Sequence, residues 1–298
     1  MYLNTLEVTL TPRTKSSSYH LQINQGTLDI LSIIFEFKVA TGWHISRFLS
    51  QKDKSKYIYF KLRRLWESEF LESFKVYAGS ITGMPLYYML SKKGLILLAE
   101  QGRYDKTLIK NYPKAKTLLS WGLFKHEAQV IELASMEAKN ISKNLNITFK
   151  GEMSSGGYDF RSNKNIEVFT PDYTATYAFG KKVVPVYTEY ERTNKSKDAL
   201  LRKIERYVQY LNREHREESI LRFIFQTQKM EESFWLRLLS DKAYFLNTVK
   251  VVTTNILLFD NPTKFLEPIY ASERTLRLTQ NGRLSANITT RIKLFPYL

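Results

Sequence analysis

The stretch 183–213, VVPVYTEYERTNKSKDALLRKIERYVQYLNR, decides the fold of the second half of the chain. Residues 183–190 are rich in β-branched and aromatic side chains, which predicts a strand. Residues 197–213 predict a helix, because apolar residues recur there at helical spacing and form one buried stripe of Leu200, Ile204, Val208 and Leu211. The apolar run 220–225 predicts a second, buried strand. Strand, helix and strand in this order favour a mixed α/β domain.

Four acidic residues lie near the ends or turns of the strands predicted in this half: Glu152, Asp172, Glu189 and Glu191. Glu189 and Glu191 are two residues apart on an extended chain, so both side chains point to the same face of the sheet. The strand expected at 173–179 is joined to the strand at 183–190 by a short turn, which predicts a hairpin. In such a hairpin, Asp172 lies beside the two glutamates.

Converging carboxylates repel one another unless a cation neutralises them. Oxygen ligands, without Cys and with few His, suit Mg²⁺ or Mn²⁺ rather than zinc, so we expect Asp172 and Glu189 to bind one of these ions. On a basic protein, such a site predicts phosphodiester cleavage by metal-activated water. The alternative for each acid, taken singly, is a surface pair with one of the abundant lysines or arginines.

The first part of the chain predicts three helices followed by a two-stranded ribbon (strands at 73–77 and 86–90), the order of a winged helix-turn-helix. The third helix, expected at 54–69, would bury Ile58, Leu62 and Leu65. Its other side carries the residues expected to bind DNA: Lys54, Lys56, Tyr57, Lys61, Arg63 and Arg64. A solvated basic face and a protein-binding winged helix are the competing interpretations.

The composition agrees with a nucleic-acid partner. With 45 basic and 29 acidic residues among 298, the formal net charge is +16, and both halves of the chain are basic. The absence of Cys excludes disulfides, thiolate zinc sites and a Cys nucleophile. No apolar run approaches the roughly 20 residues of a membrane helix, and the first residues lack a secretory signal. We therefore expect a cytoplasmic protein.

Five regions are expected along the chain. They are an N-terminal arm or edge strand (1–24), a winged-helix DNA-binding domain (25–102), a basic connector (103–125), a nuclease-like core (126–272) and a basic C-terminal appendage (273–298). A helix beginning at His126 would open the core. The arginines of the appendage would add phosphate contacts.

The order Pro171-Asp172, a hairpin, Glu189-Tyr190-Glu191 and a helix with Lys203 resembles the PD-(D/E)XK nuclease superfamily. More narrowly, the chain resembles the replication-relaxation family of plasmids and mobile elements over most of 27–265. The residues that carry this resemblance are RRLWESEFLES, YYMLSKKG, His126, PDYTATY, the stretch from Glu189 to Tyr210 and VVTTNILLFDNP. It is also similar to mobilization relaxases built on a restriction-endonuclease-like core.

The resemblance implies a fold and a set of catalytic residues. It implies a restriction-endonuclease-like mixed-sheet core, with Asp172, Glu189, Glu191, Lys203 and Glu152 as catalytic residues. Glu191 stands where the superfamily has its Lys, so Lys203 on the following helix would supply the cation. Lys195 is nearer in sequence but is expected in a solvated loop.

The resemblance also implies an activity. The leading hypothesis is a site-specific protein of a plasmid or mobile element that binds double-stranded DNA at an origin and nicks it with Mg²⁺ or Mn²⁺. The second hypothesis is a non-catalytic replication or transfer accessory protein with a degenerate core. The third is a restriction- or transposition-type endonuclease, which would need a homodimer or a partner to cut both strands. The protein could also act as one component of a transfer or replication complex.

Overall fold

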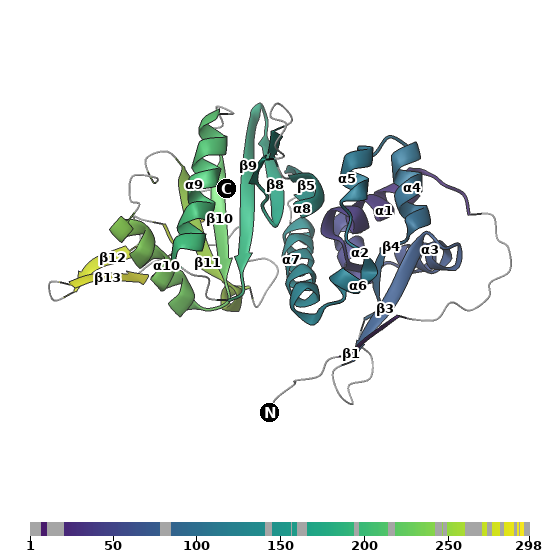
Figure 1. The fold of residues 1–298 in the computed structure, drawn as a ribbon, viewed down its shortest axis with the longest axis horizontal. Helices are drawn as coiled ribbons and strands as arrows, with labels where there is room; N and C mark the ends of the chain where they lie inside the picture. The colour runs from purple at the N-terminus through teal and green to yellow at the C-terminus, as the bar shows by residue number, and fades with distance from the viewer. Residues whose placement is uncertain are drawn as a thin grey trace. The chain divides into compact units, whose positions relative to one another are not determined.

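The computed structural model divides the chain into two compact units, Met1–Lys139 and Asn140–Leu298. The structure describes residues 7–10, 21–77, 85–140, 145–155, 157–159, 166–193, 197–213, 218–241, 246, 249–259, 270–272, 276–280, 283–288, 291, 293 and 294. Each unit is described by itself below (Figure 1).

The first unit begins with three helices and a small antiparallel sheet, as the sequence predicted. The helices are α1 (Gln25–Phe37), α2 (Gly42–Ser50) and α3 (Lys56–Glu67). The sheet has the order β1-β3-β4-β2, with bounds Glu7–Leu10, Leu71–Tyr77, Tyr87–Leu90 and Ala40–Thr41. The edge strand expected in the N-terminal arm is β1. The predicted turn between the ribbon strands lies largely outside the described residues.

Both ends of α1 are defined by local contacts and backbone geometry. Asn24 caps the helix, because its side-chain oxygen accepts a hydrogen bond from the Thr27 amide at 3.0 Å. The helix ends at Phe37, where Lys38 takes φ 64°. Gly42 opens α2. A Cβ there would lie 2.6 Å from the ring of Tyr59, so a larger residue would have to displace this ring.

The region expected as a connector is helical and belongs to the first unit. It contains α5 (Lys106–Lys110), α6 (Ala115–Leu118) and the start of α7 (Trp121–Lys139), and it follows α4 (Lys92–Glu100). The two compact units divide after Lys139, whereas the sequence placed the division within 103–125. The physical reason is that α7 packs against α2 through an apolar face and charged contacts.

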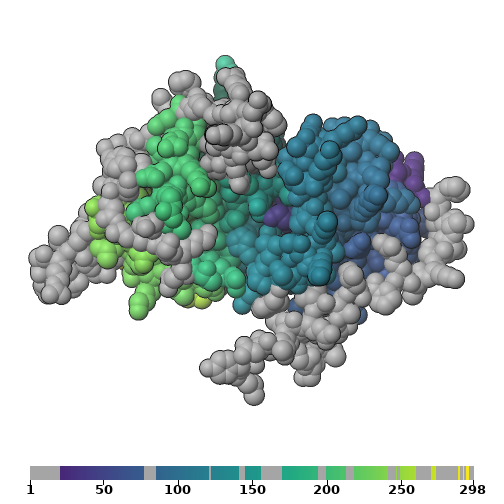
Figure 2. Space-filling view, viewed as in Figure 1, coloured from purple at the N-terminus to yellow at the C-terminus, as the bar shows by residue number. Residues whose placement is uncertain are grey.

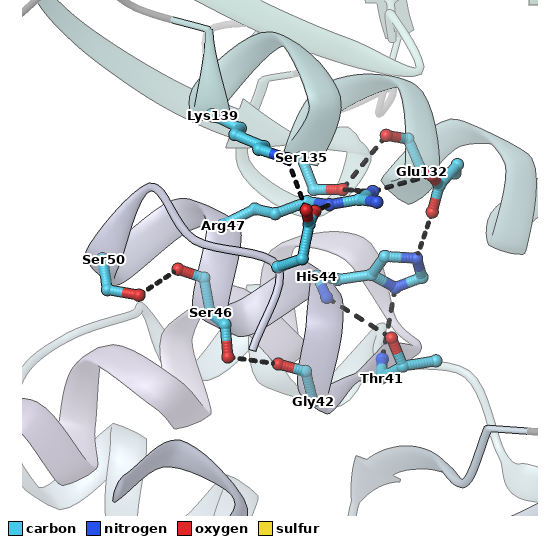
Figure 3. Close-up of polar contacts among 10 residues, drawn as sticks. Thr41, Gly42, His44, Ser46, Arg47, Ser50, Glu132, Ser135 and Lys139 are labelled. Atoms are coloured by element: carbon cyan, nitrogen blue, oxygen red, sulfur yellow. Dashed lines mark hydrogen bonds and ion pairs between the residues drawn. The ribbon is translucent and has the colours of Figure 1, made fainter. Parts of the chain in front are cut away.

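A polar network fastens α2 to α7 (Figure 3). The carboxylate of Glu132 on α7 accepts from the Arg47 guanidinium at 2.7 Å and pairs with Nε2 of His44 at 2.8 Å. The backbone amide of Thr41 donates to Nδ1 of His44, which leaves Nε2 as the donor to Glu132. Burial lowers the pKa of His44. Burial also acts to raise the pKa of Glu132, but the hydrogen bond from His44 and the adjacent Arg47 guanidinium outweigh it and lower that pKa to about 2.

The second unit is built on a five-stranded mixed sheet with the order β11-β10-β9-β8-β5. Its strands are Asn146–Gly151 (β5), Tyr173–Phe179 (β8), Lys182–Glu191 (β9), Ile220–Phe225 (β10) and Lys250–Asn255 (β11). β9, β10 and β11 are parallel, whereas β8 is antiparallel to both β9 and β5. The hairpin predicted from the sequence is thus β8–β9.

Two helices cover one face of this sheet, α9 (Lys197–Arg213) and α10 (Gln228–Asp241) (Figure 1). The stripe predicted for α9 is buried and packs on apolar residues of β10 and β11. Each large apolar side chain buried there contributes about 1.5–3 kcal/mol. The outer side of α9 lies at the surface and is seen in green in Figure 2. Burial of one stripe therefore sets which face of α9 meets the sheet.

Short elements complete the second unit. They are α8 (Glu152–Ser155), β6 (Gly157–Asp159), β7 (Ile166–Phe169), a 3₁₀ turn (Ile256–Leu258), β12 (Leu276–Gln280) and β13 (Arg283–Ile288). Near the C-terminus, Arg291 donates to the fully buried Glu231 of α10 at 2.9 Å. Arg291 is therefore a structural anchor in this unit, not the phosphate contact expected from sequence. Among the described residues, no helix is long and apolar enough to cross a membrane.

Candidate active site

The β8–β9 hairpin sets Asp172 beside Glu189. Tyr173 pairs with Thr188, so the residue before Tyr173 lies opposite the residue after Thr188. Asp172 also accepts a hydrogen bond, at 2.6 Å, from the backbone amide of Tyr190 to its Oδ2. The sequence predicted that this aspartate and the glutamates of the next strand would lie together, and the register of the hairpin confirms it.

Glu189 and Glu191 point to the sheet face covered by α9, where both are buried, with Glu189 0% exposed. The Lys203 ammonium donates to Oε2 of Glu189 and, at 3.1 Å, to Oε1 of Glu191. The Tyr207 hydroxyl donates to Oε1 of Glu189 at 2.6 Å. The predicted approach of Lys203 to Glu189 is therefore observed. It follows from helical spacing, because Lys203 and Tyr207 are one turn apart and flank the buried Ile204.

The electrostatics of this cluster are governed by burial and by the excess of carboxylates. Burial is the main reason that the pKa of Glu189 rises to about 8. The charge of Lys203 acts to lower this pKa, whereas the negative charges of Asp172 and Glu191 act to raise it. Burial alone would lower the pKa of Lys203, but the three carboxylates raise it above its ordinary value. Burial and the adjacent Glu189 raise the pKa of Tyr207 well above its usual range. Lys203 is therefore charged, and the Tyr207 hydroxyl stays protonated.

The donor set fits a hard divalent cation in charge and chemistry. The carboxylates of Glu189 and Glu191 both contact the Lys203 ammonium, and Asp172 lies opposite Glu189 in the hairpin. Carboxylate oxygens are the ligands that Mg²⁺ and Mn²⁺ prefer. In the arrangement observed, however, both oxygens of Glu189 already accept hydrogen bonds. Within the described part of the chain, no three His, Asp or Glu side chains are spaced as a ready-made metal site.

A pocket of about 290 Å³, counted with its open mouth, adjoins the cluster at Glu191. It lies where β9 and β10 end and α10 begins, and it is lined by Glu191, Thr193, Leu200, Phe225, Met230, Ser233, Phe234 and Arg237. Arg237 and Thr193 were missed by the sequence reasoning. No local signal marks Arg237, because α10 approaches β9 only through the tertiary fold.

Two further residues were considered from the sequence, Glu152 and Lys195. Glu152 begins α8 directly after β5, whose last residue pairs with Tyr173. It therefore lies at the same end of the sheet as Asp172 and is half-buried, but topology alone places it there. Lys195 lies outside the described residues.

The residues expected to bind DNA lie on or just before α3. Its apolar stripe of Ile58, Leu62 and Leu65 is buried, as predicted. Lys54, Lys56, Tyr57 and Arg63 are exposed, whereas Lys61 and Arg64 are half-buried. Arg63 forms an ion pair with Glu67 at 2.8 Å on the same helix. The basic face is thus presented away from the core.

Comparison with known proteins gives one finding. The sequence model of the Replication-relaxation family matches residues 31–222, which include α3, the β8–β9 hairpin and α9. The comparisons with curated proteins and with solved structures find no match.

Proposed function

The chain belongs to the replication-relaxation family, and from this premise we propose that it is a site-specific DNA-binding protein of a plasmid or mobile element that nicks DNA by metal-dependent phosphodiester cleavage. In this proposal the first unit is a winged helix-turn-helix and the second a restriction-endonuclease-like core. The partner is double-stranded DNA at an origin.

The observation that carries the proposal is the cluster of Asp172, Glu189, Glu191 and Lys203 at the edge of the sheet. An aspartate and two glutamates on adjacent strands, with a lysine from the next helix, are the residue types that a phosphodiesterase needs. Lys203 is the residue best placed to replace the missing Lys of the superfamily motif, because its ammonium contacts both glutamates.

In this proposal each residue of the cluster would have a distinct role in cleavage. Asp172 and Glu189 would hold Mg²⁺ or Mn²⁺, and the bound ion would supply charge compensation and an activated water. Lys203 would turn from Glu189 towards the phosphate and stabilise the charge that develops there. Glu191 would keep the ammonium of Lys203 near the reacting group, and Glu152 would assist from the same end of the sheet. Arg237 in the adjoining pocket is suited to hold a neighbouring phosphate.

A plasmid relaxation assay tests the proposal. Supercoiled plasmid carrying the cognate origin is incubated with the full chain and Mn²⁺, Mg²⁺ or EDTA, and the open-circular product is measured. Asp172→Asn and Glu189→Gln should abolish nicking while DNA affinity stays the same or rises, because a charge that repels phosphate is removed. EDTA should stop the reaction.

Lys203 has a matched control on the same helix, the exposed Arg202. Lys203→Ala should reduce nicking by at least about 100-fold, since one electrostatic contact to the reacting phosphate is worth about 10²–10³ in rate. Arg202→Ala should cost little, as should Lys195→Ala. Equal nicking by Lys203→Ala and Arg202→Ala would remove Lys203 from the site.

A specific observation favours a second function, a replication or transfer accessory protein that binds DNA without cutting it. Lys203 and Tyr207 already engage both oxygens of Glu189, so a cation has to compete with two buried hydrogen bonds. If the wild type nicks no supercoiled substrate with either metal but binds origin DNA, this second function is the correct one.

A further inference from the structure

The surface around α3 carries large aromatic rings that the fold does not bury. Tyr57 is 54% exposed and Phe60 53%, and Trp43 on α2 is 37% exposed. Tyr59 is also exposed, but its ring packs against Gly42, so packing between α2 and α3 explains it. The three other rings cost solvation free energy in the isolated protein, and their exposure points to a binding partner.

Each of the three rings has a cationic side chain against it. The Arg64 guanidinium lies 4.6 Å from the centre of the Phe60 ring, and the Lys61 ammonium lies 5.7 Å from the centre of the Tyr57 ring. The Lys54 ammonium lies 6.0 Å from the Trp43 ring. We name Trp43, Lys54, Tyr57, Phe60, Lys61 and Arg64 the aromatic–basic face.

Helical spacing makes most of this face continuous. Tyr57, Phe60, Lys61 and Arg64 follow one another at i, i+3, i+4 and i+7, so they form one stripe beside the buried face of α3. Rings and cations thus alternate along about two turns of helix. This is the arrangement that binds a chain of flat bases joined by phosphates.

Single-stranded and duplex DNA differ in whether their base faces are accessible for stacking. In a duplex each base is stacked on its neighbours, so an exposed ring finds no free base face. An unpaired base offers its whole face, and stacking on an aromatic side chain is insensitive to base identity. We propose that the aromatic–basic face binds an unpaired, single-stranded segment of DNA, with bases on Tyr57 and Phe60 and phosphates on Lys61 and Arg64. This inference rests on the proposed function, because both place DNA on α3.

Charge argues against a protein partner on this face. Lys54, Lys56, Lys61, Arg63 and Arg64 lie on or just before α3, and the only acid of the helix, Glu67, pairs with Arg63. The cores of protein interfaces are depleted in lysine. A polyanion is the better match to the face.

The test measures binding of the full chain to three labelled DNAs of the same sequence by fluorescence anisotropy: a single strand, a perfect duplex and a duplex with a central unpaired bubble. Trp43→Leu and Phe60→Leu keep helix-forming, apolar side chains but remove the rings. Each should weaken binding to the single strand and the bubble about 10-fold, with much less effect on the duplex. Ile96→Ala, at an exposed apolar residue of α4, is the control and should change none of the three.

Three results would overturn the inference. One is unchanged single-strand binding by both ring variants; another is an equal loss on all three DNAs, which would mean that the rings serve duplex binding. The third is a wild-type dimer in sedimentation analysis that the ring variants convert to monomer, which would identify a protein interface. If the wild type binds none of the DNAs, the proposed function fails as well. If it binds duplex normally while the ring variants show no single-strand defect, only this inference fails.

Discussion

Glu189 is a buried carboxylate in the second unit, and its ionised form is unfavourable there. It is fully buried, it sits between Asp172 and Glu191, and its only charged compensation among the contacts described is Lys203. A buried carboxylate in this setting holds its proton to higher pH than a free glutamate. Ionisation of Glu189 therefore destabilises the folded state increasingly as the pH rises.

This cost predicts a pH dependence of unfolding. The pKa of Glu189 is about 8 in the folded protein and about 4.5 when unfolded, so the folded state binds more protons between these values. Stability from this group is therefore greatest below about pH 4.5 and falls as the pH rises to about 8, by at most about 1.4 kcal/mol per pH unit. The raised pKa of Lys203 adds no slope in this window, since the lysine is charged throughout it.

Urea unfolding of the wild type and of Glu189→Gln at several values between pH 5 and pH 8 checks this. The free energy of unfolding of the wild type should fall relative to the variant as the pH rises. The surface variant Glu218→Gln is the control and should run parallel to the wild type. Parallel curves for wild type and Glu189→Gln would contradict the assignment of a raised pKa.

At the scale of elements, α3 combines a structural role with the binding role proposed for it, because its two faces are chemically distinct. Ile58, Leu62 and Leu65 hold the helix on the core. The basic residues are kept outside by the same periodicity. Substituting the outer residues should therefore change binding without unfolding the unit.

The basic face predicts a defined salt dependence. Each of Lys61, Arg63 and Arg64 that contacts a phosphate releases about one counterion, so its replacement by Ala should flatten the slope of log K against log salt by about one unit. Binding should weaken for all duplex sequences alike. The measurement is a titration of duplex DNA at several salt concentrations, with Lys106→Ala and Lys110→Ala on α5 as controls. Normal duplex binding by a folded triple variant of Lys61, Arg63 and Arg64 would refute the winged-helix assignment.

At the scale of the whole molecule, the chain is organised as two compact units that divide after Lys139. The helix α7 belongs to the first unit because Glu132 holds His44 and Arg47, and because Glu127 pairs with the buried Lys38 at 2.7 Å. A division at 125 would break all of these contacts.

Two truncations distinguish these boundaries. A fragment that ends at Lys139 should melt cooperatively and bind duplex DNA. One that ends at Lys125 loses the buried Val130, Ile131 and Leu133, each worth about 1.5–3 kcal/mol, which is comparable with the whole stability of a small domain. It should show no cooperative melt by circular dichroism. Equal melting of the two fragments would place α7 outside the first unit.

The sequence by itself determined most elements and the pairing of Asp172 with Glu189, because apolar periodicity and the alternation of strand faces are local properties. Predicted and observed bounds agree at Tyr173–Phe179, Lys197–Arg213 and Ile220–Phe225. It also determined which side of α9 is buried, and hence that Lys203 could reach the strand edge.

Only the tertiary structure decided which unit α7 joins, that Arg291 is bound to Glu231, and that Arg237 lines a pocket beside Glu191. It also decided that Trp43, Tyr57 and Phe60 remain exposed, each with a cation against its ring. Each of these depends on contacts between residues far apart in the chain, or on which surfaces other elements cover. Local sequence patterns do not encode such contacts. The apolar periodicity of a helix such as α7 shows which face is buried, but not which part of the chain covers that face.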